Sequence, residues 1–150
     1  MIDGATGSFV DKWLAVQPQQ RVALGFVDER TRDERIALAA LEQELVSSAY
    51  GIREPQVAAA KLQWWAEELS GAAASGGRHP LTKLLFGSDR ARAIPANLWL
   101  APVLAAMAQL EQGTPSDFSA QVAASRGLHG ALAALENAWW FGPGAPVTRP

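Results

Sequence analysis

The sequence contains no cysteine, a single tyrosine and no long uninterrupted apolar segment. Without cysteine there is no disulfide framework, no thiolate metal ligand and no cysteine nucleophile, which suits a reducing compartment. The longest apolar run, residues 98–108, is interrupted by Pro102 and is far shorter than the roughly 20 residues that span a bilayer. The N-terminus lacks the basic start and the apolar run of a signal peptide. We therefore expect a cytoplasmic protein, whose surface could still make peripheral contact with a membrane.

A strong charge of one sign is also lacking. Lysine and arginine number 13 and aspartate and glutamate 15, which gives a net charge of −2 and no basic stripe. Nucleic-acid binding needs clustered basic residues, so nucleic acid is not an expected partner. His79 and His129 are far apart in the sequence and have no metal-ligand spacing. No cofactor or metal is therefore expected from composition.

Alanine and other apolar residues are abundant instead. Apolar residues make up 49% of the 150-residue chain and charged residues 19%, as in a globular domain. Alanine favours closely packed helices, and no alternating strand pattern is present. We predict an all-α bundle of about six helices over residues 1–141, followed by a Pro/Gly-rich tail over residues 142–150 that is extended or disordered.

Capping signals predict where these helices begin and end. Pro18 suits a first turn, Thr31 with Glu34 forms a capping box, and Gly51 suits a helix stop. The predicted helices cover residues 18–27, 31–50, 55–69, 80–86, 95–112 and, after a capping signal at residues 114–117, a stretch to residue 141. Residues 70–77 and 87–93 are predicted to be loops.

Helical spacing also predicts which side chains are buried. Ile36, Leu41 and Leu45 form an apolar stripe that should continue through residues 46–50, which should face the interior of the domain or its groove, whereas Glu42 and Glu44 should lie off it. Trp65 should be buried between helices and Trp64 should face the surface. Glu67 and Glu68 are expected to be solvated. An exposed apolar strip that favours self-association or a partner protein is predicted at Leu132, Leu135, Trp139 and Trp140.

The centre of the sequence resembles the second signature stretch of the squalene/phytoene synthase family. The likeness rests on three segments, which are Arg53-Glu54-Pro55, Trp64-Trp65-Ala66-Glu67-Glu68-Leu69 and His79-Pro80-Leu81. A weaker likeness runs from residue 37 to about residue 140. Members of this family condense prenyl diphosphates, so the resemblance implies part of the isoprenoid (terpenoid) synthase fold. The non-catalytic, complex I assembly factor-like members are the most similar.

The chain departs from this family at its reactive positions. Active members hold Mg²⁺ with aspartates on two facing helices, because ionising an allylic diphosphate requires its charge to be neutralised. Here Val46, Ser47 and Tyr50 occupy the positions of the first aspartate cluster, and the second cluster would lie beyond Pro150. The resemblance therefore implies a scaffold whose metal motif is degenerate and which has no catalytic residues.

Other positions are candidates for holding a ligand. The cavity-lining candidates are Leu45, Trp65, Gln121, Gly127 and Gly130. The two glycines lie inside a helix at a cost of about 1 kcal/mol each, which either close helix packing or room for a ligand would explain. Arg53 and Arg126 are candidates for binding phosphate, and a solvated surface role is the alternative for both.

Three functions remain open. The favoured one is a catalytically degenerate protein that binds an apolar isoprenoid or lipid ligand or a partner protein. The second is an active Mg²⁺-dependent prenyltransferase, for head-to-head condensation of prenyl diphosphates, completed by missing helices or a partner chain. The third is a structural adaptor without a ligand.

Overall fold

The computed structural model describes residues 2–146, which are largely helical and contain no strand. The elements are α1 (Gly4–Val16), α2 (Gln20–Ala23), a 3₁₀ turn (Leu24–Phe26), α3 (Glu29–Tyr50), α4 (Pro55–Ser75), α5 (Pro80–Phe86), α6 (Asp89–Ala93), α7 (Ala96–Glu111) and α8 (Phe118–Phe141). The prediction of an all-α bundle is confirmed. None of the described helices is long and apolar enough to cross a membrane.

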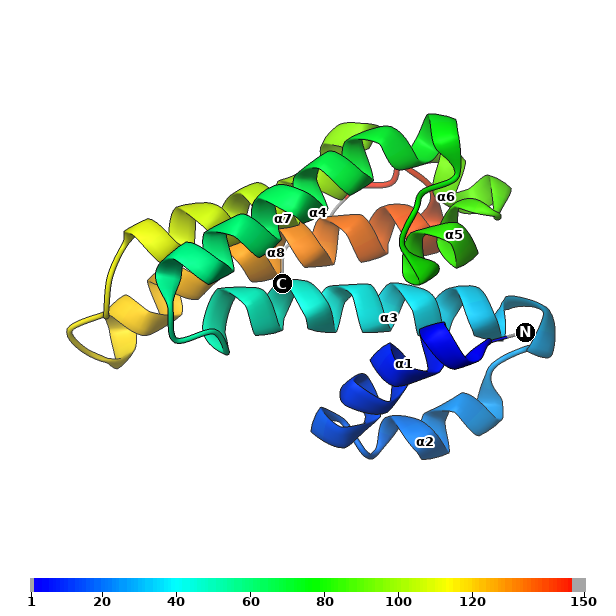
Figure 1. Ribbon diagram of the computed structural model, residues 1–150, viewed down its shortest axis with the longest axis horizontal. Helices are drawn as coiled ribbons and strands as arrows, with labels where there is room; N and C mark the ends of the chain where they lie inside the picture. Colours follow the sequence, from blue (N-terminus) through cyan, green and yellow to red (C-terminus); the bar gives the residue numbers. More distant parts are fainter. Residues whose placement is uncertain (1, 147–150) are drawn as a thin grey trace.

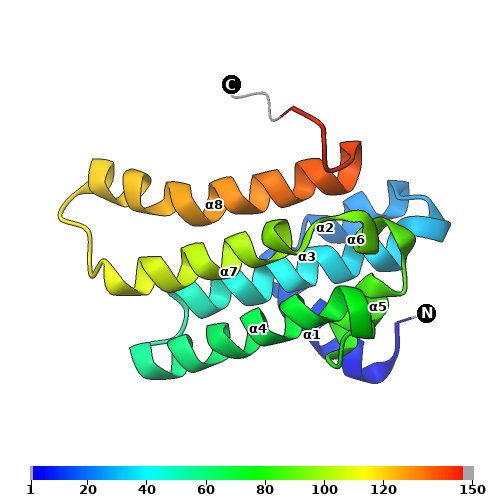
Figure 2. The same cartoon turned by 90° about the horizontal axis from the view of Figure 1, so that it is seen from above.

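Four long helices run alongside one another and form the body of the molecule (Figure 1). Helix α7 packs against α3, α4 and α8, while α3 also packs against α1 and α5. Figure 2 shows α8 outside α7, on the side away from α4. The short helices α2, α5 and α6 gather with α1 near the N-terminal end of α3. This arrangement leaves α8 as an outer layer whose main neighbour is α7.

The core is built around aromatic side chains that α4, α5 and α7 contribute. Trp65, Trp99 and Phe86 are each at most 1% exposed, and the rings of Phe86 and Trp99 lie 4.9 Å apart. The Trp99 indole N–H donates to the Ala91 carbonyl over 3.3 Å, so this buried polar atom is satisfied. Trp64 is 38% exposed. The predicted contrast between Trp64 and Trp65 is therefore confirmed.

Several helix ends lie where the capping signals predicted them. His79 caps α5, and its Nδ1 accepts from the Leu81 amide at 3.1 Å. Asp117 caps α8 by accepting from the Ala120 amide at 2.9 Å. Helix α3 ends at Tyr50 with Gly51 as its C-cap. Side chains that satisfy the first free amides of a helix thus mark the start of α5 and α8.

The first 30 residues differ from the predicted helices in two ways. Residues 4–16 form α1, for which no helix was predicted. Asp3 caps this helix, and Trp13 anchors it in the core at 3% exposure. Helix α3 begins at Glu29 rather than Thr31, because Asp28 accepts from the Arg30 amide at 2.9 Å and serves as the cap. The Thr31 hydroxyl donates to the Asp28 carbonyl instead.

Two predicted loops are helical. Helix α4 continues through residues 70–75 and ends at Gly76, whose φ of +81° is the left-handed conformation that glycine adopts readily. The buried Ala72 accounts for the extension, since it packs into the core. Residues 89–93 form α6, in which Ser88 is the cap and Ala91 is buried. Within the predicted tail, residues 142–146 turn back on α8, where Asn137 donates to the Ala145 carbonyl, and residues 147–150 lie outside the described part.

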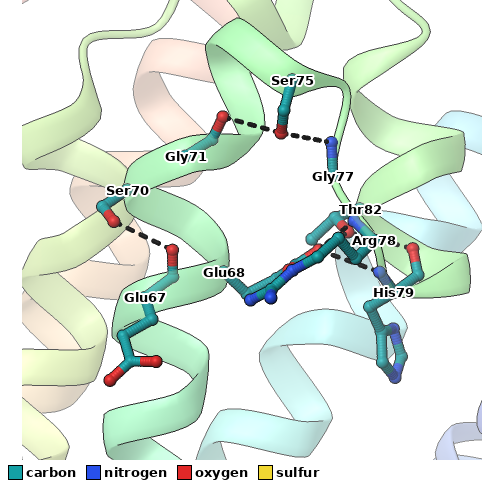
Figure 3. Close-up of polar contacts among 9 residues, drawn as sticks. All are labelled: Glu67, Glu68, Ser70, Gly71, Ser75, Gly77, Arg78, His79 and Thr82. Atoms are coloured by element: carbon teal, nitrogen blue, oxygen red, sulfur yellow. Dashed lines mark hydrogen bonds and ion pairs between the residues drawn. The ribbon is translucent and has the colours of Figure 1, made fainter.

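Glu68 joins the end of α4 to the start of α5 (Figure 3). It is 2% exposed, and its Oε1 accepts from the amides of Arg78 and His79 at 2.5 and 2.9 Å and from the Thr82 hydroxyl at 2.5 Å. Its Oε2 accepts from Arg78 Nε at 3.0 Å. Burial acts to raise the pKa of Glu68, but the bonds from Thr82, His79 and Arg78 prevail and lower it to about 2. The prediction that Glu68 is solvated was therefore wrong.

We expect Trp65→Ala to lower the free energy of unfolding by about 3–5 kcal/mol, the usual cost of truncating a fully buried aromatic side chain. The matched variant Trp64→Ala should cost much less, because Trp64 is partly exposed. Urea unfolding followed by circular dichroism measures both. Equal losses at the two positions would contradict the core described above.

Glu68→Gln should destabilise the fold by roughly 2–3 kcal/mol at neutral pH, since it weakens a set of charge-assisted hydrogen bonds. The exposed neighbour provides the control, and Glu67→Gln should change stability by less than about 0.5 kcal/mol. The ionised Glu68 stabilises the wild type fully above its ordinary pKa of 4.5, and this contribution is lost as the pH falls towards 2. Unfolding curves across this range should therefore show a smaller acid loss in Glu68→Gln than in the wild type.

Candidate functional site

An open cleft of about 480 Å³ lies between α3 and α8 and is bordered by α1 and α2. The two long helices run antiparallel, so the start of α3 faces the end of α8 (Figure 1). The volume is in the range of small-molecule binding sites. The lining residues are Trp13, Gln17, Gln20, Arg35, Leu38, Ala39, Glu42, Gln43, Val46, His129, Leu132, Ala133, Glu136 and Trp140. We call this hollow the α3–α8 cleft.

Aromatic contacts mark both ends of the α3–α8 cleft. At one end the Arg35 guanidinium lies over the Trp140 ring, 5.1 Å from its centroid. At the other end the His129 ring stacks on Tyr50, with centroids 6.2 Å apart and an interplanar angle of 12°. Tyr50 is held in turn by its hydroxyl, which donates to Gln109 on α7 over 2.9 Å. Apolar side chains of Leu38, Val46 and Leu132 line the space between these ends.

Two carboxyl groups are the most unusual feature of the α3–α8 cleft. Glu42 projects from α3 and Glu136 from α8. Burial raises the pKa of Glu42 to about 9, and the negative charge of Glu136 contributes in the same direction. At neutral pH Glu42 therefore keeps its proton and can donate it in a hydrogen bond to Glu136. The Oε1 atom of Glu42 is buried and has no hydrogen-bond partner among the residues that the structure describes.

The three positions that the resemblance aligns with the first aspartate cluster lie in different surroundings. Val46 is half-buried and lines the α3–α8 cleft. Ser47 is half-buried, and its hydroxyl accepts from Gln43 Nε2 at 2.9 Å. Tyr50 is 43% exposed and lines a second, smaller hollow. The fully buried residues of this turn are Leu45 and Ser48.

The structure does not bring the other candidate residues together. Leu45 and Trp65 lie in the core and do not line the α3–α8 cleft. Gln121 lines a separate hollow of about 270 Å³, which also contains Tyr50. Arg53 and Arg126 are exposed and lie outside both hollows.

The two glycines of α8 have different neighbours. A Cβ atom added to Gly127 would lie 3.9 Å from the Cβ of Ala105 on α7, which is an ordinary packing distance. A Cβ atom added to Gly130 would have no neighbour within 4 Å. Neither position therefore requires glycine for close helix packing, and neither lines the α3–α8 cleft.

The predicted apolar strip on α8 is not exposed as a continuous surface. Leu135 and Trp139 are 1% and 3% exposed because they pack into the core, where Trp139 meets Trp99 edge to face. Trp140, at 42% exposure, is the member of the strip that remains substantially exposed. The basis on which the sequence predicted self-association is therefore wrong.

Sequence reasoning missed the buried Glu44, and it missed that the half-buried Glu42 lies beside the exposed Glu136. Glu44 is buried on the stripe from which it was excluded, and it pairs with Lys61 at 2.8 Å and with Lys12 at 3.7 Å. The proximity of Glu42 and Glu136 becomes apparent only when α3 and α8 are known to be antiparallel neighbours. The one signal in the sequence was that Glu42, Glu44 and Glu136 each lie within an otherwise apolar helical face.

The described residues do not fit the magnesium cluster of the active squalene/phytoene synthases. Val46, Ser47 and Tyr50 offer no carboxylate at the first motif. Within residues 2–146 no group of three or more histidine, aspartate or glutamate side chains gathers closely enough to hold a metal ion. We therefore derive no step through Mg²⁺.

Comparison of the chain with models of known protein families, with curated proteins and with solved structures found no match. The resemblance to squalene/phytoene synthases remains a prediction that rests on the sequence segments quoted above. The geometry of the α3–α8 cleft is accordingly the main guide to function.

Glu42→Gln should stabilise the protein at neutral pH by roughly 1–3 kcal/mol, because the carboxyl group of the wild type must take up a proton on folding and the glutamine amide need not. Because the pKa of Glu42 is raised in the folded wild type, folding favours the protonated carboxyl group. The contribution of Glu42 to the stability of the wild type is therefore greatest below pH 4.5 and falls as the pH rises towards 9. The glutamine amide stays neutral and can donate to Glu136 across this range. Thermal unfolding in mildly acidic and mildly alkaline buffers measures the effect. A variant less stable than the wild type at alkaline pH would contradict the assignment.

Proposed function

We propose that the chain is a non-catalytic protein that binds an apolar ligand of the isoprenoid or lipid class in the α3–α8 cleft. The observation that carries this proposal is the open space beside Val46, at the position where the resemblance to prenyl-condensing enzymes implies a substrate cavity. A filled core at this point would have excluded a ligand. The cleft combines apolar side chains, such as Leu38, Val46 and Leu132, with polar and charged side chains that can orient an amphipathic molecule.

The apolar side chains that line the α3–α8 cleft favour the binding of an apolar chain. Leu38, Val46 and Leu132 each present apolar surface to the α3–α8 cleft. Removing such surface from water contributes about 25 cal/mol per Å². The distance along α3 from Arg35 to Val46 is eleven residues, or roughly 16 Å at 1.5 Å per residue, which suits an extended chain. An elongated amphipathic molecule fits this shape better than a compact polar one.

The degenerate motif supports a binding role without catalysis. Condensation of prenyl diphosphates needs carboxylates that hold Mg²⁺ beside the leaving group, and Val46, Ser47 and Tyr50 cannot supply them. The prenyltransferase alternative requires Mg²⁺-dependent release of pyrophosphate from farnesyl diphosphate by the purified chain. Detection of that release would overturn the proposal.

The cleft can be filled by a single substitution at an exposed position. Ala133 lines the α3–α8 cleft and is exposed, so Ala133→Phe should occupy the space without disturbing the core. Ala123→Phe is the matched control, because Ala123 is exposed on the same helix but lies outside the cleft. The probe is farnesol, an uncharged isoprenoid alcohol, and its binding is followed by the fluorescence of the tryptophans, two of which line the cleft.

We expect saturable binding of farnesol to the wild type and to Ala123→Phe. Ala133→Phe should bind about tenfold more weakly or worse, a loss of ~1.4 kcal/mol or more. Equal binding by all three proteins would place the ligand elsewhere. An absence of binding in the wild type would reject the ligand proposal and favour the adaptor alternative.

A further inference from the structure

The charges that line the α3–α8 cleft do not balance when every group is ionised. Arg35 contributes one positive charge, and Glu42 and Glu136 contribute two negative charges. The remaining titratable side chain is His129, which stacks on Tyr50 at the far end. The lining residues from α1 and α2 are uncharged. When both glutamates are ionised, the cleft therefore has one carboxylate without a matching cation.

Arg35 does not compensate the charge of Glu42. The two residues are seven positions apart on α3, which separates their backbones by about 10 Å along the helix axis. The Arg35 guanidinium lies instead over the Trp140 ring at the end of the cleft. A cation held at that position leaves the middle of the cleft without positive charge.

Nearby amide groups do not satisfy Glu42 either. Gln43 Nε2 donates to the Ser47 hydroxyl at 2.9 Å, and Gln20 Nε2 donates to Gln17 Oε1 at 3.4 Å. Glu42 Oε1 therefore remains buried without a donor within the described residues. The other buried glutamates differ, because Glu44 has Lys61 and Glu68 has four donor groups. A buried acceptor without a partner is costly and is rare in folded proteins.

We propose that the α3–α8 cleft selects an apolar ligand that carries an ammonium group, and that this group lies between Glu42 and Glu136. This inference rests on the proposed function and specifies its ligand class. An ammonium group has up to three N–H donors and one positive charge. It supplies the cation that the two carboxylates need once both are ionised, and it donates to the carboxyl groups of Glu42 and Glu136 that line the cleft. The apolar chain then lies along Leu38, Val46 and Leu132.

Binding of the ammonium group is coupled to release of a proton. In the free protein Glu42 is protonated at neutral pH, so the pair carries one negative charge. The arriving cation favours the ionised form of Glu42, and the proton leaves to the solvent. The occupied cleft then holds two carboxylates, the guanidinium of Arg35 and the ligand's ammonium group, which sum to zero. The coupling predicts tighter binding of the ammonium ion as the pH rises through neutrality.

The inference predicts an order of affinity among ligands that share one chain. The probes are n-octylammonium, n-octanol and octanoate, each used below the concentration at which it self-associates. Calorimetric titration of the full chain at neutral pH should show n-octylammonium binding about tenfold or more tightly than n-octanol, with octanoate weakest. Titrations in buffers of different ionisation enthalpy should show close to one proton released for each n-octylammonium bound.

Glu42→Gln supplies the decisive variant, because it retains the shape of the side chain and cannot ionise. It should bind n-octylammonium no more tightly than n-octanol, and it should release no proton on binding. Glu67→Gln is the matched control on an exposed glutamate and should behave as the wild type. Circular dichroism confirms that each variant is folded.

The results of these titrations test the ammonium inference and the existence of the apolar site separately. Equal binding of n-octylammonium and n-octanol by the wild type would overturn the ammonium inference and leave the apolar site intact. Tightest binding of octanoate would also overturn it and would assign the polar end to Arg35. If no probe binds, both the inference and the proposed function fail.

Discussion

Helix α7 packs against α3, α4 and α8 at once, and the position of the other long helices depends on this contact. Trp99, Val103 and Ala106 are fully buried on its inner side. Its small residues allow α8 to lie close, as the spacing between Ala105 and Gly127 shows. Because α8 packs mainly on α7, its flank toward α3 is not filled by side chains. The α3–α8 cleft is therefore a consequence of how the bundle is assembled.

The buried glutamates of α3 and α4 show three ways of accommodating a carboxyl group. Glu68 accepts hydrogen bonds from the turn that follows α4, and Glu44 pairs with Lys61 and Lys12. These two groups connect helices and leave no acceptor unsatisfied. Glu42 has neither a lysine nor a set of amides and keeps a proton instead. That contrast identifies Glu42 as the group whose partner would come from outside the chain.

Local signals in the sequence predicted much of the fold and little of the candidate site. Asp117 and His79 cap their helices as expected, because capping depends on residues only two or three positions away. Helix α1 was not predicted, because burial of Trp13 against the rest of the core, which local signals do not reveal, stabilises it. The prediction of an exposed apolar strip on α8 was wrong, because helical spacing shows which residues share a face but not what covers that face. Val46 was placed beside an interior space correctly, but the pairing of Glu42 with Glu136 depends on a long-range contact between helices.

The central claim is that the α3–α8 cleft holds a carboxyl group that stays protonated at neutral pH until a cation reaches it. The most direct test is a ¹³C NMR titration of the free protein, labelled at the glutamate carboxyl carbons and assigned with Glu42→Gln. The account predicts that one carboxyl signal, missing from the variant, titrates with a pKa near 9. A Glu42 signal that titrates near the ordinary value of 4.5 would contradict the account, because the cleft would then hold two ionised carboxylates without a ligand.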